Sequence, residues 1–283
     1  MKLRATFVLG FWLHSLEGQV SHERILQAAK DPGNWLTYSG NYLGWRYSPL
    51  DQINRENVGK LKVKWIYQMP TTHVVETTPL VVDGVMYFSE PPSNVVAVDA
   101  ETGKQFWRYR RALPPKINVC CGQVNRQIAV LGDRVFVGTV DAHLLALDAR
   151  TGDVLWDVEV ADYRTGHSIT AAPLVVKDMV ISGISGGEYG VLGFLAAYDA
   201  KSGKRIWRFW TVTGTGEPGT QTWSGNSWKT GGGPTWVTEL SMQLRTLSSG
   251  EPGILHRTGT EIRAWETTCI PTVPLRSMPT RVS

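Results

Sequence analysis

Two adjacent cysteines, Cys120 and Cys121, form the sharpest chemical signal in the sequence. A disulfide between neighbouring cysteines closes a small ring and strains the peptide bond between them, so it persists only where the surrounding structure enforces it. Two buried thiols are the alternative, and in an arbitrary protein they are the more common arrangement. Arg126 follows in the same segment. The segment therefore combines sulfur chemistry with a fixed positive charge.

Oxygen-bearing side chains occur in three other segments. Glu76 and Thr170 each precede a strand-like run, and taken alone they are a surface glutamate and an ordinary β-forming threonine. A carboxylate is a suitable ligand for a hard cation such as calcium. One run combines a flexible, hydroxyl-bearing turn with such a carboxylate: Ser185, Gly186, Gly187 and Glu188.

A repeated motif separates these segments. The pattern A-x-D-x-x-[TS]-G-x-x-x-W occurs at residues 97–107, 146–156 and 197–207. Asp and Thr or Ser bond the backbone of a tight turn, Gly supplies the positive φ that closes it, and the flanking Ala and Trp take buried positions. Repeats of about 50 residues with several short strands in each are typical of propeller blades.

A hairpin pattern precedes each copy of the motif, at residues 78–88, 128–137 and 172–181. Each has a short polar turn between β-branched stretches, and two hairpins give four strands per blade. Trp65 marks the end of an earlier strand, and the only helix expected lies near residues 22–30. The sequence predicts an all-β, incomplete β-propeller with about four blades of four antiparallel strands, in which three tryptophans take equivalent buried positions: Trp107, Trp156 and Trp207.

The repeat resembles the tryptophan-docking motif of the quinoprotein dehydrogenases, which use pyrroloquinoline quinone (PQQ). The resemblance covers about residues 30–238, and residues 34–40 and 46–54 are similar to the segment with which that family's propeller begins. Members are eight-bladed propellers in which each motif tryptophan wedges between neighbouring blades. The resemblance therefore implies the first four blades of a PQQ-dependent alcohol dehydrogenase.

The resemblance also implies roles for the residues around a flat cofactor. Cys120 and Cys121 match the family's vicinal disulfide, which lies against one face of PQQ. Arg126 matches the arginine that donates to the quinone carbonyls. Residues 231–236 match the loop that brings a tryptophan, here Trp236, under the other face. These matches describe a sandwich for a planar, anionic quinone.

The remaining matches concern the edge of the cofactor. Glu76 resembles a glutamate that bonds the cofactor near the disulfide, and Thr170 a threonine that contacts a PQQ carboxylate. Residues 185–187 resemble the loop that holds PQQ carboxylates, and Glu188 resembles a calcium ligand. In the family, calcium and the arginine polarise a quinone carbonyl while an aspartate removes the alcohol proton. We therefore expect PQQ and Ca2+ as cofactors, a small primary alcohol as substrate and a cytochrome c as electron acceptor.

Two departures from the family follow in the C-terminal part. Pro234 stands where some members have a cofactor-binding threonine. Residues 239–283 contain no Asp, Asn, Lys, Tyr or Phe, and neither the family's calcium-binding asparagine nor its catalytic aspartate occurs there. A shifted reading frame over residues 248–263 can yield the family's Trp-Gly-Thr-Gly-Asn-Pro run. We expect an aberrant tail at 239–283, frame-shifted or disordered, no catalytic residue, and a truncated enzyme that is inactive or impaired.

Composition and the N-terminus bear on location. The 283 residues are 42% hydrophobic, and a net charge of +4 gives no reason to expect a nucleic-acid partner. Lys2 and Arg4 precede an apolar run at residues 5–13, which predicts a signal peptide over residues 1–20; a plain hydrophobic helix is the alternative. No segment has the length of a membrane span. We expect a periplasmic protein, with the partial propeller at residues 21–238.

Two other functions compete with alcohol oxidation. A non-enzymatic propeller used as a binding or assembly scaffold, as in outer-membrane-assembly lipoproteins, can share the repeat, but it predicts neither the cysteine pair nor Glu188. A sugar or aldehyde quinoprotein dehydrogenase is the other. Several of those lack adjacent cysteines, so Cys120 and Cys121 favour alcohols.

Overall fold

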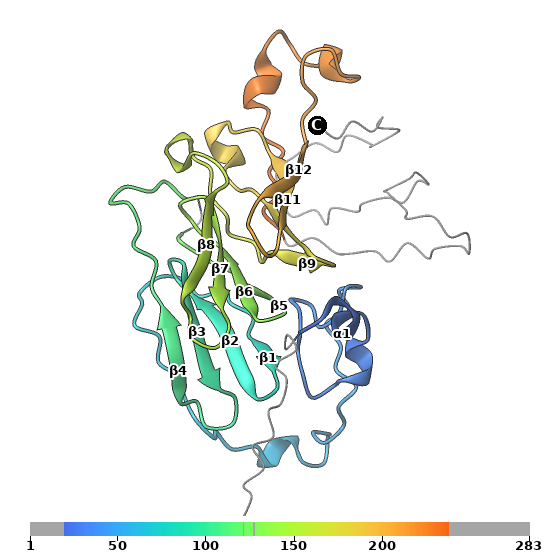
Figure 1. The fold of residues 1–283 in the computed structure, drawn as a ribbon, viewed down its shortest axis with the longest axis vertical. Coiled ribbons are helices and arrows are strands. Elements are labelled where there is room, and N and C mark those ends of the chain that lie inside the picture. The colour runs from blue at the N-terminus through green and yellow to red at the C-terminus, as the bar shows by residue number, and fades with distance from the viewer. Residues whose placement is uncertain (1–19, 121, 127, 238–283) are drawn as a thin grey trace, which may run out of the picture.

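The computed structural model describes residues 20–120, 122–126 and 128–237, which form three four-stranded antiparallel sheets (Figure 1). Strands that follow one another in the chain are neighbours in each sheet. The predicted all-β propeller class is confirmed, and the described residues complete three of the expected four or so blades. Their strands are β1 (Leu80–Val82), β2 (Val85–Glu90), β3 (Asn94–Asp99) and β4 (Gln105–Tyr109); β5 (Ile128–Leu131), β6 (Arg134–Gly138), β7 (His143–Asp148) and β8 (Val154–Glu159); β9 (Leu174–Val176), β10 (Met179–Gly183), β11 (Phe194–Asp199) and β12 (Arg205–Trp210).

The three sheets share one register at the repeated motif. In each sheet the motif alanine of the third strand faces the motif tryptophan of the fourth, and the pairing shifts directly after that alanine. Such a shift is a β-bulge, which bends the outer strand and increases its twist. The tryptophans therefore occupy equivalent positions, as predicted, in the pairs Ala97 with Trp107, Ala146 with Trp156 and Ala197 with Trp207.

The motif aspartate closes the turn between the third and fourth strands. The Asp99 carboxylate accepts bonds from the amide of Glu101 and from the amide and hydroxyl of Thr102, at 2.7–3.0 Å. These bonds, those from Thr102 first, lower the pKa of Asp99, and Ser202 lowers the pKa of Asp199 in the same way. The Asp and Thr or Ser of the motif are thus explained by local turn chemistry.

The first two described blades each dock on the next through the motif tryptophan. The indole Nε1 of Trp107 donates to the Ala149 carbonyl at 3.0 Å, and its ring covers Gly152, where an added Cβ would lie 2.6 Å from the ring. Trp156 repeats this contact on the third sheet and Trp65 on the first. Trp65 therefore stands where the outer edge of a preceding blade belongs, although residues around it form no paired strand in the described structure.

The expected burial of the three tryptophans is only partly correct. Trp107 is 8% exposed, whereas Trp156 and Trp207 are half-buried. Trp207 belongs to the last sheet of the described chain, and no further described sheet lies beside it to cover the indole ring.

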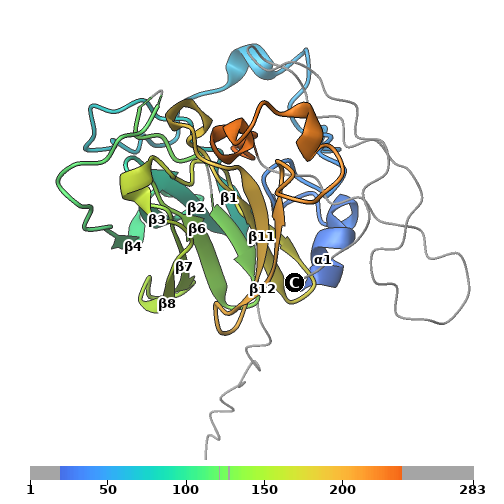
Figure 2. The same cartoon turned by 90° about the horizontal axis from the view of Figure 1, so that it is seen from above.

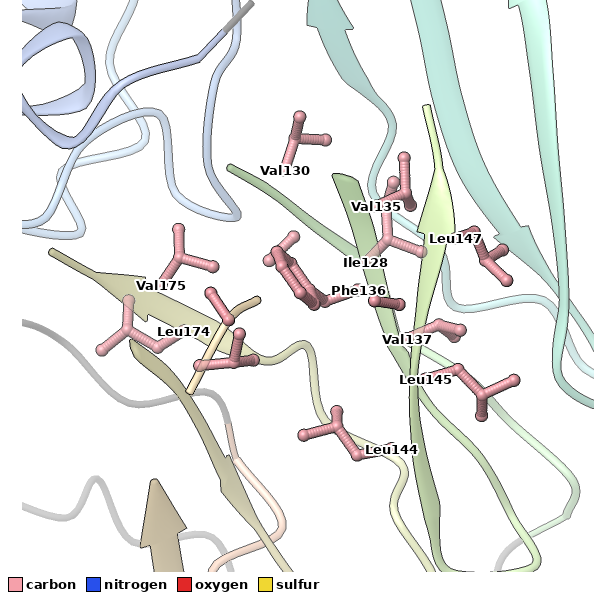
Figure 3. Packing of buried hydrophobic residues seen from close by; sticks show 14 of the residues in the cluster. Ile128, Val130, Val135, Phe136, Val137, Leu144, Leu145, Leu147, Leu174 and Val175 are labelled. Carbon is pink, nitrogen blue, oxygen red and sulfur yellow. The ribbon is translucent and has the colours of Figure 1, made fainter. Parts of the chain in front are cut away.

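The core lies between the sheets and is made mainly of aliphatic side chains. Figure 3 shows Phe136 between the labelled side chains of the second sheet and Leu174 and Val175 of β9. Small motif alanines such as Ala146, fully buried, let neighbouring sheets approach closely. The inner strands of the three sheets are therefore held by one continuous core.

The N-terminal segment crosses the inner strands. Helix α1 (His22–Leu26) begins after Ser21, whose hydroxyl accepts a bond from the Arg24 amide. In Figure 1 the helix lies near the ends of β1 and β9. In Figure 2 the outer strand β4 lies on the opposite side of the molecule from the helix. Contacts to all three sheets follow, namely Val20 with Gly132, Trp35 with Val81 and the Tyr42 hydroxyl with the Val175 carbonyl.

The other helices are short 3-10 turns, and no helix in the described ranges has the length and apolar character needed to cross a bilayer. Two of them flank the candidate site, η3 (Tyr163–Thr165) and η4 (Gly187–Tyr189). The others are η1 (Ala28–Lys30), η2 (Val58–Lys60), η5 (Thr220–Thr222) and η6 (Ser227–Thr230).

Candidate functional site

The candidate residues lie in connections at one end of the sheets. Glu76, Arg126 and Thr170 each precede the first strand of a sheet, β1, β5 and β9 respectively. Glu188 lies between β10 and β11, and because β10 runs antiparallel to β9 it returns to that same end. Trp236 follows the third sheet. The repeated topology thus gathers five segments that are far apart in the sequence.

Arg126 is the centre of this group. Its Nη2 lies 2.8 Å from Oε2 of Glu76, and its guanidinium carbon lies 4.9 Å from the centre of the Trp236 ring. The side chains of Arg126 and Glu76 are 20% and 39% exposed, and Trp236 is 41% exposed. A cation, a carboxylate and an aromatic face therefore meet at a surface that a ligand can reach.

The backbone of Arg126 links three blades. Its carbonyl accepts a bond from the Thr78 amide at 3.1 Å, and its own amide donates to the Thr170 carbonyl at 3.0 Å. Amide bonds between segments that lead into successive blades fix the positions of those segments. The charged group of Arg126 is thus carried on backbone that is held from both sides.

Two hydroxyl groups face each other beside this backbone. Thr170 Oγ1 and Ser185 Oγ are 2.7 Å apart, and Thr170 is 5% exposed. Ser185 is placed by paired backbone bonds with Ser168. The two hydroxyls therefore form one hydrogen-bonded pair, in which one of the two protons is used between them and the other stays available to an acceptor.

The turn after Ser185 requires its glycines. Gly186 has φ +119°, and a Cβ there would lie 2.1 Å from the Gly166 carbonyl oxygen. A Cβ on Gly187 would lie 2.8 Å from the ring of Pro234. The turn is therefore packed between the β8–β9 connection and the segment that carries Trp236, with Pro234 as a packing residue at this point.

Thr235 anchors the segment that presents Trp236. Its amide donates to the Ile184 carbonyl at 2.9 Å, and its hydroxyl accepts from the Ile184 amide at 3.0 Å and donates to the Phe194 carbonyl at 2.5 Å. These three bonds tie residues 234–236 to β11 and to the end of β10. The indole beside Arg126 is therefore held by its neighbour in the chain.

Glu188, the predicted calcium ligand, lies in η4 after this turn. The described residues contain no group of three or more His, Cys, Asp or Glu side chains that could hold a metal ion. A cation bound at Glu188 would therefore take its other oxygens from groups of another kind, such as a bound cofactor or main-chain carbonyls.

The cysteine pair is only partly within the structure. Cys120 is partly exposed in the long connection between β4 and β5, and Cys121 lies outside the described residues. The disulfide between them stays a prediction.

A second charged cluster holds the start of that connection. The Arg111 guanidinium contacts Asp141 at 2.7 Å and Asp157 at 2.5 Å, and Asp157 also lies 2.6 Å from His143 Nδ1. Burial acts to raise the pKa of Asp157, but the bonds from Arg111 and His143 prevail and the pKa is lowered. Arg111 thus ties the connection that carries Cys120 to the second sheet.

Sequence reasoning missed the residues that hold the site in place. Thr77, Ser89, Asn125 and Thr235 touch the segments of the candidate residues, and Ser89 and Asn125 are fully buried. For Thr77, Ser89 and Asn125 the signal was a polar residue within or beside an apolar strand, since buried polar groups in native proteins are generally hydrogen-bonded.

Comparison with known proteins gives the family. Residues 35–243 match the family model described as "Glucose/ethanol/alcohol dehydrogenase, beta-propeller domain", under the name PQQ. A quinoprotein alcohol dehydrogenase of Pseudomonas putida is 41% identical over 237 residues, which cover 77% of this chain and 40% of that protein. A lanthanide-dependent methanol dehydrogenase of Methylacidiphilum fumariolicum is 38% identical, with 82% of this chain and 42% of that protein covered.

Solved structures agree. A quinohemoprotein alcohol dehydrogenase from Pseudomonas putida superimposes with a TM-score of 0.72 at 40% identity, covering 79% of this chain and 35% of that chain. A europium-containing methanol dehydrogenase gives 0.68 at 38% identity, covering 76% and 41%. The chain spans about two fifths of the length of the two curated relatives. It belongs to the family of PQQ-dependent alcohol dehydrogenases and matches their β-propeller domain.

Proposed function

We propose that residues 21–238 form one part of the cofactor site of an enzyme that oxidises a primary alcohol to an aldehyde with PQQ. The observation that carries this proposal is the meeting of Arg126, Glu76 and Trp236 at 2.8 Å and 4.9 Å on one partly exposed surface. A cation over an aromatic face is suited to a flat anion, which can stack on the ring and accept bonds from the guanidinium.

The donor set fits PQQ, a planar quinone with carboxylate groups. Trp236 offers a stacking face, and Arg126 offers fork-shaped donors for quinone oxygens. The hydrogen-bonded pair of Thr170 and Ser185 offers one further hydroxyl proton to a carboxylate. PQQ, when bound, supplies the hydride acceptor for the alcohol. The chain's own residues would orient the ring, donate hydrogen bonds to it and, through the predicted Cys120–Cys121 disulfide, cover its other face.

A cation completes the proposal. Glu188 would be one calcium ligand, beside oxygens of the cofactor, because hard cations take six to eight oxygen ligands. The name of one relative, the lanthanide-dependent methanol dehydrogenase, makes a lanthanide the alternative ion. Glu188 suits both ions, so parallel titrations with Ca2+ and with a trivalent lanthanide would identify the ion that this chain prefers.

We further propose that the chain by itself turns over alcohol slowly or not at all. A general base contributes roughly 10²- to 10⁴-fold to such reactions, and residues 239–283, where the family's catalytic aspartate is expected, contain no Asp. We also propose export to the periplasm by residues 1–20 and a cytochrome c as electron acceptor. Cell fractionation of a reporter fused after residue 20 tests the export.

The decisive experiment is a titration of the purified chain with PQQ in the presence of Ca2+, followed by quenching of tryptophan fluorescence. We expect saturable binding at one site, weakened in Trp236→Leu. A dye-linked ethanol assay then compares the chain with a version whose reading frame is restored after residue 238, and only the restored protein should be active. Failure of the chain to bind PQQ would refute the proposed site and favour a non-enzymatic propeller.

A further inference from the structure

Ser89 occupies a position that carries no side chain in the other two sheets. It pairs with Val95, two residues before the motif alanine, as Gly138 pairs with Leu144 and Gly183 with Leu195. The segment that follows each sheet in the chain presses on this position. A Cβ on Gly138 would lie 2.1 Å from Ile169, and one on Gly183 would lie 2.0 Å from the Thr235 carbonyl oxygen.

In the first sheet this position holds a directed chain of hydrogen bonds. The Ser89 amide donates to Thr77 Oγ1 at 3.2 Å, and the Ser89 hydroxyl donates to the Asn125 carbonyl at 2.9 Å. A hydroxyl has one proton, so in the 2.9 Å contact between the two hydroxyls Thr77 donates and Ser89 accepts. The donor and the acceptor of all three hydrogen bonds are therefore fixed, and the Ser89 hydroxyl takes part in two of them.

The ends of this chain adjoin the charged pair of the candidate site. Thr77 follows Glu76, and Asn125 precedes Arg126. The Asn125 side chain also donates from Nδ2 to the Gly138 carbonyl at 2.6 Å. Asn125 is thus held by the first blade through its carbonyl and by the second through its amide. Ser89 and Asn125 are 0% exposed, so a bond lost there leaves a buried polar group without its partner.

We propose that Ser89 is a positioning residue, which acts through Thr77 and Asn125 to set Glu76 against Arg126 for cofactor binding. This inference rests on the proposed function, since the group to be bound is PQQ. Backbone shifts of well under 1 Å at these neighbours would move the two charged side chains, and loosely held sites lose affinity on that scale.

The test uses replacements that the fold itself shows to be tolerable. Ser89→Gly introduces the residue that the second and third sheets have at this position, so it removes the hydroxyl without adding volume. Thr77→Val removes the other hydroxyl at nearly constant shape, and Thr77→Ser retains it. Ser182→Ala is the matched control, because it removes a buried β10 hydroxyl that, among the described residues, bonds only the adjacent Gly183 carbonyl.

We expect Ser89→Gly and Thr77→Val to raise the Kd for PQQ about tenfold, the loss that one or two hydrogen bonds produce. Thr77→Ser and Ser182→Ala should bind as the unmodified chain does. A purely structural role would lower the melting temperature of all hydroxyl-deleting variants and leave the Kd unchanged, and that result would overturn the proposal.

Hydrogen exchange without cofactor separates this inference from the proposed function. The Thr78 and Arg126 amides are both bonded across the blades, and Ser89→Gly should accelerate their exchange relative to strand β7. If the unmodified chain fails to bind PQQ, faster exchange would still support Ser89 as the residue that positions the pair, while the cofactor assignment would fall. Unchanged exchange at both amides would overturn the positioning role, whatever the chain binds.

Discussion

Replacing Arg126 by glutamine should separate cofactor binding from stability. The guanidinium contacts one carboxylate and one aromatic ring, and all three side chains are between 20% and 41% exposed. A salt bridge at such exposure contributes about 0–1 kcal/mol, and an exposed cation–π contact about 0.5–1 kcal/mol. Glu76 can be hydrated when its partner is gone. The expected loss of unfolding free energy is therefore at most about 2 kcal/mol.

The same change should cost far more in cofactor affinity. A hydrogen bond to a charged group contributes about 1.5–3 kcal/mol, which corresponds to roughly a 10- to 150-fold rise in the Kd for PQQ. Urea unfolding followed by circular dichroism gives the free energy of unfolding, and a fluorescence titration gives the Kd. Both measurements are made on the same purified variant.

Arg134→Gln is the matched control. Arg134 has a similar exposure, 27%, and likewise pairs with one carboxylate, Asp133, but it begins β6 at the opposite end of the sheets. It should leave the Kd unchanged. An unfolding loss well above 2 kcal/mol in Arg126→Gln, or equal Kd values in the two variants, would show that Arg126 is a structural residue and not a ligand-binding one.

Three further outcomes are expected. Gly152→Ala should destabilise the chain by about 2–5 kcal/mol in thermal unfolding, because the new Cβ both strains a left-handed backbone and overlaps the Trp107 indole. Gly84→Ala is the control: its backbone is also left-handed, at φ +83°, but open space surrounds it, so it should cost only about 1–2 kcal/mol. Asp157→Asn should lower the free energy of unfolding at neutral pH. The folded-state pKa of Asp157 lies below its ordinary value, so the gap in unfolding free energy between the variant and the unmodified chain should shrink as the pH falls through that lowered pKa. A gap that stays constant with pH would contradict the assignment. Glu188→Gln should abolish the dependence of PQQ binding on Ca2+ if Glu188 is a metal ligand, as a calcium titration would show.

The blades could be predicted because their determinants are local. The turn at Asp99 needs an acceptor, a hydroxyl and a residue with positive φ within five positions, and the sequence shows all of them in order. The spacing of the tryptophans then follows from strand length. Burial of Trp156 and Trp207 was harder to predict, since it depends on how far the neighbouring blade covers each ring.

The site was only partly predictable, because the residues that hold it make contacts between segments far apart in the sequence. Resemblance to a family pointed to Arg126 and Trp236, which the structure brings together. The residues that hold them, Ser89, Asn125 and Thr235, make bonds across blades, and no periodicity relates the partners of such a bond. A sequence shows that a serine interrupts an apolar strand, but it does not show which carbonyl the hydroxyl meets.

Blade docking and the proposed cofactor site share the same chain segments in this molecule. The Arg126 backbone bonds the first and third blades, while its side chain contacts Glu76 and lies over the Trp236 ring. Thr235 ties its segment to the third blade while the next residue presents its indole. A buried inter-blade bond costs more to break than an exposed ion pair. The geometry of the candidate site is therefore set by the packing of the blades, and we expect its exposed charges to serve the proposed cofactor binding with little effect on the fold.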